Sequence, residues 1–357
     1  MAYTNIDDPS AYFQTALYAG NNTTDHNITN DGNSNLQPDF VWIKQRTSNN
    51  PHVLQDTSRG FAGNGEANVL ISNTTGAEVT NGAFESFNTN GFGVGGTNVA
   101  SGAYNLSGSN YVAWQWKANG GTTASNTDGT ITSTVQANQD AGFSIVTYTG
   151  TSSAGTIGHG LGVAPKVVIV KARTGVPTSW AVFHKDGSTS DDDTFVLNST
   201  AAKATYAGFW NNQYPSSSVF GISTDIWLNN NGVNYVAYCF AEKQGYSKFG
   251  KYVGNGSTNG TFVYTGFKPA FVMTKKRDQV SNWTIYDNKR NPFNVADKVL
   301  LPNANNADQT VINFDFVSNG FKCRNSGSEN ESGTTFIYMA FAENPFTTST
   351  GIPTTAR

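Results

Sequence analysis

Three stretches of the 357-residue chain repeat one local pattern, in which a proline is followed six residues later by lysine and eight residues later by arginine. β-Branched and aromatic residues fill most of the gap, which is typical of a strand. A pattern that occurs three times predicts one structural unit that occurs three times. The stretches are 38–46 (PDFVWIKQR), 165–173 (PKVVIVKAR) and 269–277 (PAFVMTKKR).

Other elements recur in a constant order around these stretches. A Tyr-x-Gly precedes each one, and a short polar turn followed by a second apolar run comes after it, which predicts a β-hairpin. Each unit then closes on a strand marked by a tyrosine. The recurring residues are Tyr18, Tyr148 and Tyr252 in Tyr-x-Gly, His52, Trp180 and Trp283 at the start of the second run, and Tyr111, Tyr235 and Tyr338 in the closing strand.

The order of these elements predicts the domain boundaries. We expect one repeat at 1–117, which includes a short N-terminal segment, a second at 142–245 and a third at 246–346. Residues 118–141 contain no aromatic side chain and are predicted to be a polar linker, and 347–357 a polar tail. The second and third repeats abut and should share an interface, while the first should be hinged on the linker.

Composition and turn signals favour an all-β fold. Charged residues make up only 13% of the chain, aromatic residues also 13%, and glycine occurs 37 times, which suits strands joined by many turns. Asn-Gly pairs recur, and we find no segment that reads as the crossover helix of a parallel α/β fold. Units near 100 residues are too long for propeller blades of about 40–50 residues. The expected fold is three tandem antiparallel β-sandwich repeats of jelly-roll or lectin-like type.

Charge and hydropathy exclude several classes of function. The net charge is −3, and no basic run suggests a nucleic-acid partner. No apolar stretch approaches the roughly 18 residues that span a bilayer, so no membrane insertion is expected, and the N-terminus lacks the pattern of a signal peptide. Cys239 and Cys323 form no CxxC or mixed Cys/His pattern, which indicates buried thiols rather than a disulfide framework.

Motifs that suggest chemistry are weak. Residues 91–96 (GFGVGG) formally match a dinucleotide fingerprint, but a poor helix former follows them. The four histidines lack zinc spacing, and residues 191–193 (three aspartates) lack the spacing of a known calcium loop, so a solvated turn is favoured there. We therefore expect no catalytic, cofactor-binding or metal-binding residues and no enzyme activity.

Two further sets of residues have a structural and a functional interpretation. The repeated Lys-x-Arg pairs could hold acidic sugars or phosphate, but their recurrence favours strand ends that pair with a carboxylate such as Asp56 or Asp287. Aromatic residues in polar loops could stack on sugar rings or could belong to the core. The candidates for glycan contact are Trp210, Tyr214 and Trp227 in the second repeat.

Several long phrases of the sequence, taken together, resemble a known family. They include IDDPSAYFQTALYAG, DGNSNLQPDFVWIKQR, YVAWQWKANGG and GHGLGVAPKVVIVKAR, and they extend from about residue 5 to 346. As a set they are similar to a family of virion structural or tail fibre-like proteins of tailed bacteriophages that are common in the sea, including cyanophages. The resemblance implies a particle component with no established catalytic residues.

The resemblance and the residues together predict a non-enzymatic virion structural protein. It would be tail-associated, in a fibre or adsorption apparatus, and its loops would recognise the host surface. The alternatives are a capsid decoration protein and a polysaccharide depolymerase. The expected partners are other virion proteins, further copies in a homo-oligomer and a host-surface glycan, and the expected location is the virion, made in the host cytoplasm and released by lysis.

Overall fold

The computed structural model describes residues 3–95 and 102–354, and these residues confirm the predicted all-β fold. They form six sheets whose strand pairs are antiparallel; in each unit of the chain we call the sheet that contains the Lys-x-Arg strand the large sheet and the other the small sheet. The short helices are η1 (Pro9–Ala11), α1 (Ile226–Asn229) and η2 (Ser328–Asn330). The helices of the described residues include none that is long and apolar enough to cross a membrane.

Each large sheet belongs to one unit of the chain, and each unit adds one small sheet. Unit one contains β1 (Phe13–Ala19), β2 (His26–Thr29), β3 (Phe40–Gln45), β4 (Val53–Asp56), β5 (Ala67–Ile71), β6 (Val79–Asn81), β7 (Phe84–Asn88), β8 (Gly91–Val94) and β9 (Asn110–Trp116). Its large sheet has the order β1-β9-β3-β4-β5-β6 and its small sheet the order β2-β8-β7.

Unit two has the longest sheet. It contains β10 (Ala124–Asn126), β11 (Ser133–Asn138), β12 (Phe143–Thr149), β13 (Gly155–Gly158), β14 (Val167–Ala172), β15 (Ala181–His184), β16 (Asp193–Val196), β17 (Ala204–Thr205), β18 (Val219–Ile222) and β19 (Asn234–Phe240). The large sheet has the order β10-β11-β12-β19-β14-β15-β16-β17, and β13 pairs with β18. Residues 118–141 are therefore not a linker, because β10 and β11 extend this sheet.

Unit three pairs two sheets of equal size. It contains β20 (Ser247–Val253), β21 (Phe262–Tyr264), β22 (Phe267–Lys276), β23 (Thr284–Asp287), β24 (Ala296–Val299), β25 (Gln309–Val317), β26 (Gly320–Cys323) and β27 (Thr335–Pro345). The sheet orders are β20-β27-β22-β23 and β21-β26-β25-β24.

The large sheets share one connectivity: the strand that contains the tyrosine of Tyr-x-Gly pairs with the closing strand, the closing strand pairs with the Lys-x-Arg strand, and the Lys-x-Arg strand pairs with its hairpin partner. The tyrosine of each Tyr-x-Gly lies opposite an aromatic residue of the closing strand and stacks on it, with ring centroids about 5 Å apart. The pairs are Tyr18 with Tyr111, Tyr148 with Tyr235, and Tyr252 with Phe336.

The third of these pairs corrects the predicted alignment. Tyr338 was expected to match Tyr111 and Tyr235, but it lies two residues further along β27, opposite Gly250. Phe336 occupies the matching position because the contact requires a stacked ring and not a hydroxyl group.

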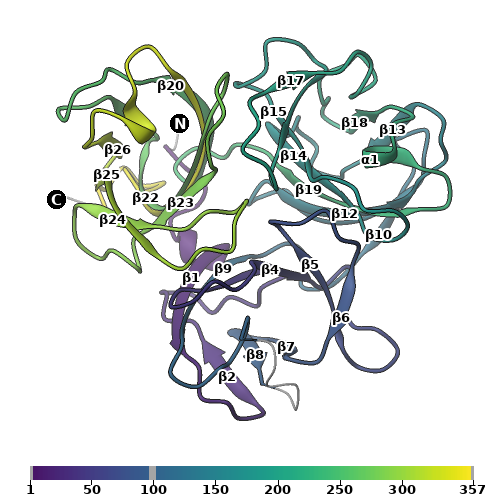
Figure 1. Cartoon of the computed structure of the whole chain (residues 1–357), viewed down its shortest axis with the longest axis horizontal. Helices are drawn as coiled ribbons and strands as arrows, with labels where there is room; N and C mark the ends of the chain where they lie inside the picture. The colour runs from purple at the N-terminus through teal and green to yellow at the C-terminus, as the bar shows by residue number, and fades with distance from the viewer. Residues whose placement is uncertain (1–2, 96–101, 355–357) are drawn as a thin grey trace.

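The three large sheets turn one face toward a common centre, around which Figure 1 shows the units as three lobes. The central cluster takes buried residues from every unit, among them Phe40, Tyr238 and Phe341. The other face of each large sheet packs on its own small sheet. The centre is filled, since the cavity enclosed there measures only about 20 Å³. Unit one is therefore part of one packed body and is not hinged.

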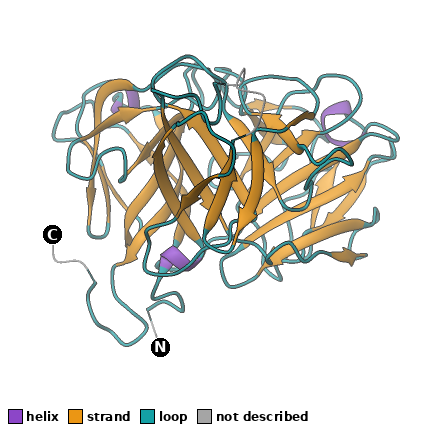
Figure 2. Ribbon diagram, turned by 90° about the horizontal axis from the view of Figure 1, so that it is seen from below, coloured by secondary structure: helices purple, strands orange, loops and turns teal. Residues whose placement is uncertain are grey.

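The first and last segments that the structure describes lie on the same side of the molecule, as Figure 2 shows. The N-terminal segment contacts unit three, where the Tyr3 hydroxyl donates to the Gly266 carbonyl at 2.7 Å. The amide of Ser349 donates to Asp7 at 2.6 Å, so the described part of the polar tail is docked on this segment.

One position of the hairpin repeat differs in unit one. Trp180 and Trp283 each donate their indole N–H to a carbonyl of the preceding unit, Ile71 and Val196 respectively. His52 holds the same position and is buried, and it accepts from Trp42 Nε1 at 2.9 Å. Unit one thus has a smaller side chain, His52, where the other units have tryptophan, and the large side chain of Trp42 lies beside it.

This exchange of volume predicts a compensating pair of substitutions. His52→Trp alone should lower the free energy of unfolding by about 1–3 kcal/mol, because it adds volume to a filled core. Adding Trp42→Met, which copies Met273 of unit three, should recover most of that loss. Urea denaturation of the two single variants and the double variant measures the coupling, and simple additivity would contradict the packing described.

Candidate functional site

The Lys-x-Arg residues lie where one unit meets the next, and they do not form an open basic site. The three lysines, Lys44, Lys171 and Lys275, are buried. Lys171 Nζ donates to the Thr75 carbonyl of unit one at 3.2 Å, and Lys275 Nζ donates to the Thr200 carbonyl of unit two at 3.2 Å. Lys171 and Lys275 therefore hold a loop of the neighbouring unit, whereas Lys44 Nζ donates to the Ser48 carbonyl of its own unit at 3.2 Å.

The arginines of the motif make contacts across the same boundaries between units. Arg46 of unit one pairs with Asp308 of unit three at 2.7 Å, and Arg173 of unit two pairs with Glu78 of unit one at 2.9 Å. At the third boundary the Arg277 carbonyl accepts from the Lys203 amide at 2.8 Å. Each unit thus contacts the next in the same sense, which makes a closed head-to-tail ring within one chain.

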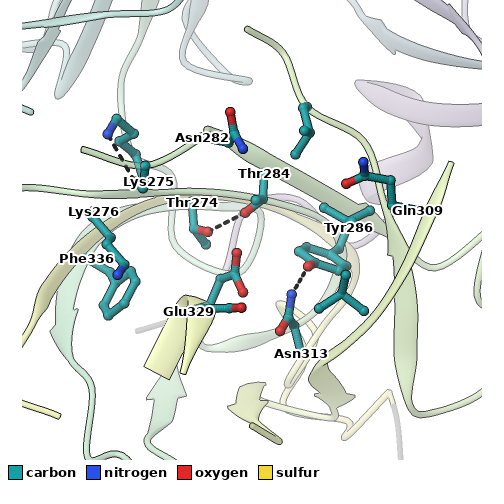
Figure 3. Close-up of a pocket in the computed structure, with 15 residues that line it drawn as sticks. Thr274, Lys275, Lys276, Asn282, Thr284, Tyr286, Gln309, Asn313, Glu329 and Phe336 are labelled. Atoms are coloured by element: carbon teal, nitrogen blue, oxygen red, sulfur yellow. Dashed lines mark hydrogen bonds between the residues drawn. The ribbon is translucent and has the colours of Figure 1, made fainter. Parts of the chain in front are cut away.

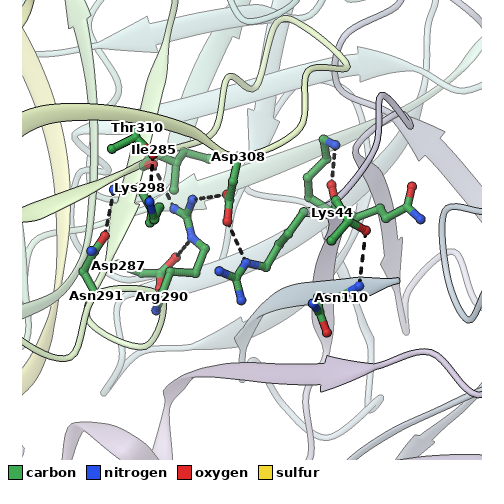
Figure 4. A network of polar contacts seen from close by, with 12 residues as sticks. Lys44, Asn110, Ile285, Asp287, Arg290, Asn291, Lys298, Asp308 and Thr310 are labelled. Atoms are coloured by element: carbon green, nitrogen blue, oxygen red, sulfur yellow. Dashed lines mark hydrogen bonds and ion pairs between the residues drawn. The ribbon is translucent and has the colours of Figure 1, made fainter. Parts of the chain in front are cut away.

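Asp56 and Asp287, the predicted partners of these pairs, have other partners. Each binds the arginine three residues later, Arg59 and Arg290, in ion pairs with fully buried side chains. Arg290 extends the network to Asp308 at 2.9 Å, and Figure 4 shows these two side chains beside Asp287. The structural interpretation of Lys-x-Arg holds, but Arg46 and Arg173 take their carboxylates from neighbouring units, and Arg277 pairs with Asp278 of its own unit at 2.7 Å.

The buried lysines predict an unusual dependence of stability on pH. Burial lowers the pKa of Lys44, Lys171 and Lys275 to about 8. Since their pKa in the unfolded chain is about 10.4, the unfolded chain binds more protons above pH ~8, and the free energy of unfolding should rise with pH. Buried Cys239 and Cys323 have raised pKa values and oppose this rise, increasingly above pH ~9.

We expect urea unfolding to show a gain on the order of 1 kcal/mol or more between about pH 7.5 and 9. Lys171→Met should reduce that gain, because it removes one of the titrating groups. A free energy of unfolding that falls across this window would contradict the burial of the three charges.

A cavity of about 290 Å³ lies between the two sheets of unit three. In Figure 3 the carboxyl group of Glu329 lies between the side chains of Thr274 and Thr284 and that of Asn313. The Thr274 and Thr284 hydroxyls are hydrogen-bonded to each other at 2.7 Å. Tyr286 accepts a hydrogen bond from Asn313 through its hydroxyl group. Polar groups from both sheets thus converge on one space.

The sheet register shows that this polar lining is specific to unit three. Thr274 faces Thr284 across the hairpin, and both residues are replaced by aliphatic side chains in the other units. The matching pairs are Ile43 with Val53 in unit one and Val170 with Ala181 in unit two.

Glu329 also lies at a position that belongs to the core in the other two units. In every unit the tyrosine of Tyr-x-Gly donates its hydroxyl to the carbonyl of one residue. That residue is Tyr104 in unit one, Leu228 in unit two and Glu329 in unit three. Unit three therefore has a glutamate where the others have large core side chains.

Few hydrogen bonds offset the burial of the Glu329 carboxyl group. The residue is 7% exposed, and its Oε2 atom has no hydrogen-bond partner among the described residues. Burial raises its pKa to about 7, although the Thr284 hydroxyl acts in the opposite direction. An unpaired buried oxygen that faces a cavity is available to a ligand.

The comparison with family models covers almost all of the chain. A model described as a domain of unknown function (DUF7483) matches residues 8–345. The chain belongs to the DUF7483 family. A search of the curated proteins finds no match. The match extends over all three units of the chain.

The aromatic residues predicted to contact glycans in this DUF7483 chain do not form an exposed platform for a sugar. Trp210 is 2% exposed, and its indole N–H donates to the Asp193 carbonyl at 3.2 Å, so it belongs to the core and offers no face to a sugar. Tyr214 is 39% exposed, but Lys185 Nζ lies 3.0 Å from the centre of its ring. Trp227 is partly buried and packs on the core of unit two.

The acidic run at 191–193 is satisfied from within its own loops. Asp192 accepts from the amides of Gly208 and Trp210, and Asp193 accepts from Thr189 and forms an ion pair with Lys203 at 2.9 Å. Across residues 3–95 and 102–354, no group of three or more His, Cys, Asp or Glu side chains is placed to hold a metal ion.

The glycine-rich run at 91–96 contributes a strand and not a phosphate loop. Gly91 begins β8, which pairs with β2 and β7 in the small sheet of unit one. Gly96 lies outside the described residues. Cys239 and Cys323 are buried free thiols, as their spacing indicated.

Sequence reasoning missed Glu329, although a signal was present. A buried asparagine precedes the stacked aromatic of each closing strand by six residues, and Glu329 comes directly before the third of these asparagines. The asparagines are Asn105, Asn229 and Asn330, and each accepts the amide of the residue that follows Tyr-x-Gly. Aligning on this asparagine places Glu329 with Tyr104 and Leu228.

Proposed function

We propose that this DUF7483 chain is a non-enzymatic structural component of a tailed-phage particle, associated with the tail and exposing loops and a binding pocket to the host surface. The observation that carries the proposal is the core shared by three sandwich units. Part-buried ion pairs of Arg46 and Arg173, together with contacts of Lys171 and Lys275, join the units into a ring. A packed body with exposed loops and a recessed pocket suits attachment to a surface.

The composition of the pocket favours binding over hydrolysis. Glycoside hydrolysis in most families requires two carboxyl groups that flank the scissile bond. Glu329 is the one acidic residue among the described side chains that line the cavity. A raised pKa would suit a general acid, but the second carboxylate of a depolymerase has no counterpart there.

The ring of units restricts which surfaces could form a homo-oligomer. Its three boundaries are all occupied within one chain, so the homo-oligomer expected from the sequence would have to use another surface. Light scattering on the purified protein measures that state.

Immunogold electron microscopy of purified particles tests the proposal. Label on the tail is the expected result, and label on the head would favour the decoration protein instead. Absence of the protein from purified particles by mass spectrometry would overturn a particle role altogether.

A further inference from the structure

The cavity of unit three combines a buried unpaired oxygen with a lining that the other units do not share. Three core positions that are apolar or aromatic in units one and two are polar here: Thr274, Thr284 and Glu329. Burying a polar group without a partner costs free energy. A core that served packing alone would not place all three around one space.

We propose that this cavity binds a single neutral sugar ring. The inference deepens the proposed function, and it depends on that function only for the source of the sugar, a host-surface glycan. A carboxyl group can contact two neighbouring hydroxyls of one ring, and the amide of Asn313 and the Thr274–Thr284 pair offer both donors and acceptors. Tyr286 and Phe336 are only 0% and 1% exposed, so their rings close the wall of the cavity, and the polar groups would make the contacts with the sugar.

The charges around the cavity argue against other ligands. Lys276 lines the cavity with Glu329, so a cationic ligand meets one ammonium group, whereas the ammonium group of Lys275 is turned to the Thr200 carbonyl. An anionic ligand meets the buried carboxyl group. Calcium takes six to eight oxygen ligands and favours several carboxylates, whereas this lining has one. A neutral polyhydroxyl compound avoids each of these costs.

Size and access restrict the ligand further. The volume of about 290 Å³ is at the lower end of the range for small-molecule sites, which suits one ring and not an oligosaccharide. The rim includes the exposed residues Asn282, Gln309 and Val311, so the rest of a glycan could leave through the opening. The bound ring would be a terminal residue.

The test uses the full-length purified protein and a panel of free monosaccharides: glucose, galactose, mannose, N-acetylglucosamine, fucose and rhamnose. Saturation-transfer NMR at millimolar sugar identifies a ligand, and titration calorimetry gives its affinity. Inorganic phosphate and calcium chloride serve as charged probes. We expect at least one neutral sugar to bind and neither charged probe to do so.

Glu329→Leu is the decisive variant, because it copies Leu228 at the matching position of unit two. We expect it to weaken sugar binding at least tenfold while the melting temperature stays equal or rises, since an unpaired buried carboxyl is removed. Thr274→Val, which copies Val170, should weaken binding with the fold intact. Glu66→Leu, which removes a carboxylate of unit one, should bind the sugar with the same affinity as the unmodified protein.

Three results would overturn the proposal: no sugar of the panel binds, phosphate or calcium binds instead, or Glu329→Leu binds as the unmodified protein does. If Glu329→Leu fails to fold, the comparison between Thr274→Val and Glu66→Leu decides. These outcomes are separate from the location of the protein in particles, so this inference and the proposed function can fail independently.

Discussion

Asp287→Ala is expected to lower the free energy of unfolding by about 3–5 kcal/mol. The Oδ2 atom of Asp287 accepts from Arg290 Nε at 2.6 Å and from Trp114 Nε1 of unit one at 3.1 Å. The side chains of Asp287 and Arg290 are fully buried. The substitution therefore leaves a buried guanidinium with one carboxylate fewer and an indole N–H without its acceptor across a boundary between units.

Asp31→Ala is the matched control. Asp31 pairs with Lys289, also between units one and three, but the two side chains are 69% and 38% exposed. An exposed pair contributes at most about 1 kcal/mol, so the loss should be small. Urea denaturation measures both variants, and equal losses would show that burial of the Asp287 network does not stabilise the ring.

Gly150→Ala is expected to cost about 3 kcal/mol or more, through a steric conflict with backbone atoms. A Cβ atom at position 150 would lie 2.2 Å from the Asn230 carbonyl oxygen. Gly20 and Gly254 have the same restriction, with carbonyl oxygens at 2.2 and 2.3 Å. The glycine of Tyr-x-Gly is therefore required by close approach of the chain that enters the closing strand.

Gly63→Ala is the control for this prediction. No atom lies within 4 Å of a Cβ built on Gly63, so alanine there should be neutral or slightly stabilising. Thermal unfolding of the two variants gives the comparison. A Gly150→Ala protein with the melting temperature of the unmodified protein would contradict the close approach of the Asn230 carbonyl to Gly150.

The local architecture of the units could be predicted because it depends on short-range patterns. The hairpin after each Lys-x-Arg follows from an apolar strand, a polar turn and a second apolar run, as in β22 and β23. The glycine of Tyr-x-Gly recurs because a carbonyl approaches it in every unit. Such constraints act on residues that neighbour each other in the chain or recur at constant spacing.

The arrangement of the units could not be predicted in this way. Arg173 pairs with a glutamate 95 residues earlier in the sequence, and nothing local marks Glu78 as its partner. The absence of aromatic residues in 118–141 suggested a linker, yet β11 needs only one buried face beside β12. A strand of an antiparallel sheet can be polar on the face that meets water, so low hydropathy does not distinguish such a strand from a connecting segment.

The candidate site escaped prediction for a related reason. Glu329 is one of 25 acidic residues, and burial is not visible in the sequence around it. Matching Tyr338 with Tyr111 also displaced the alignment by two residues near the site. The stacking ring at that position is a phenylalanine in unit three, so a rule based on tyrosine missed Phe336.

Differential scanning calorimetry of the full chain tests most directly the claim that three sandwich units are built around one core. The account predicts a single transition whose calorimetric and van't Hoff enthalpies agree, and which Asp287→Ala moves to lower temperature as a whole. Two or three separate transitions, with only one shifted by Asp287→Ala, would contradict the shared core.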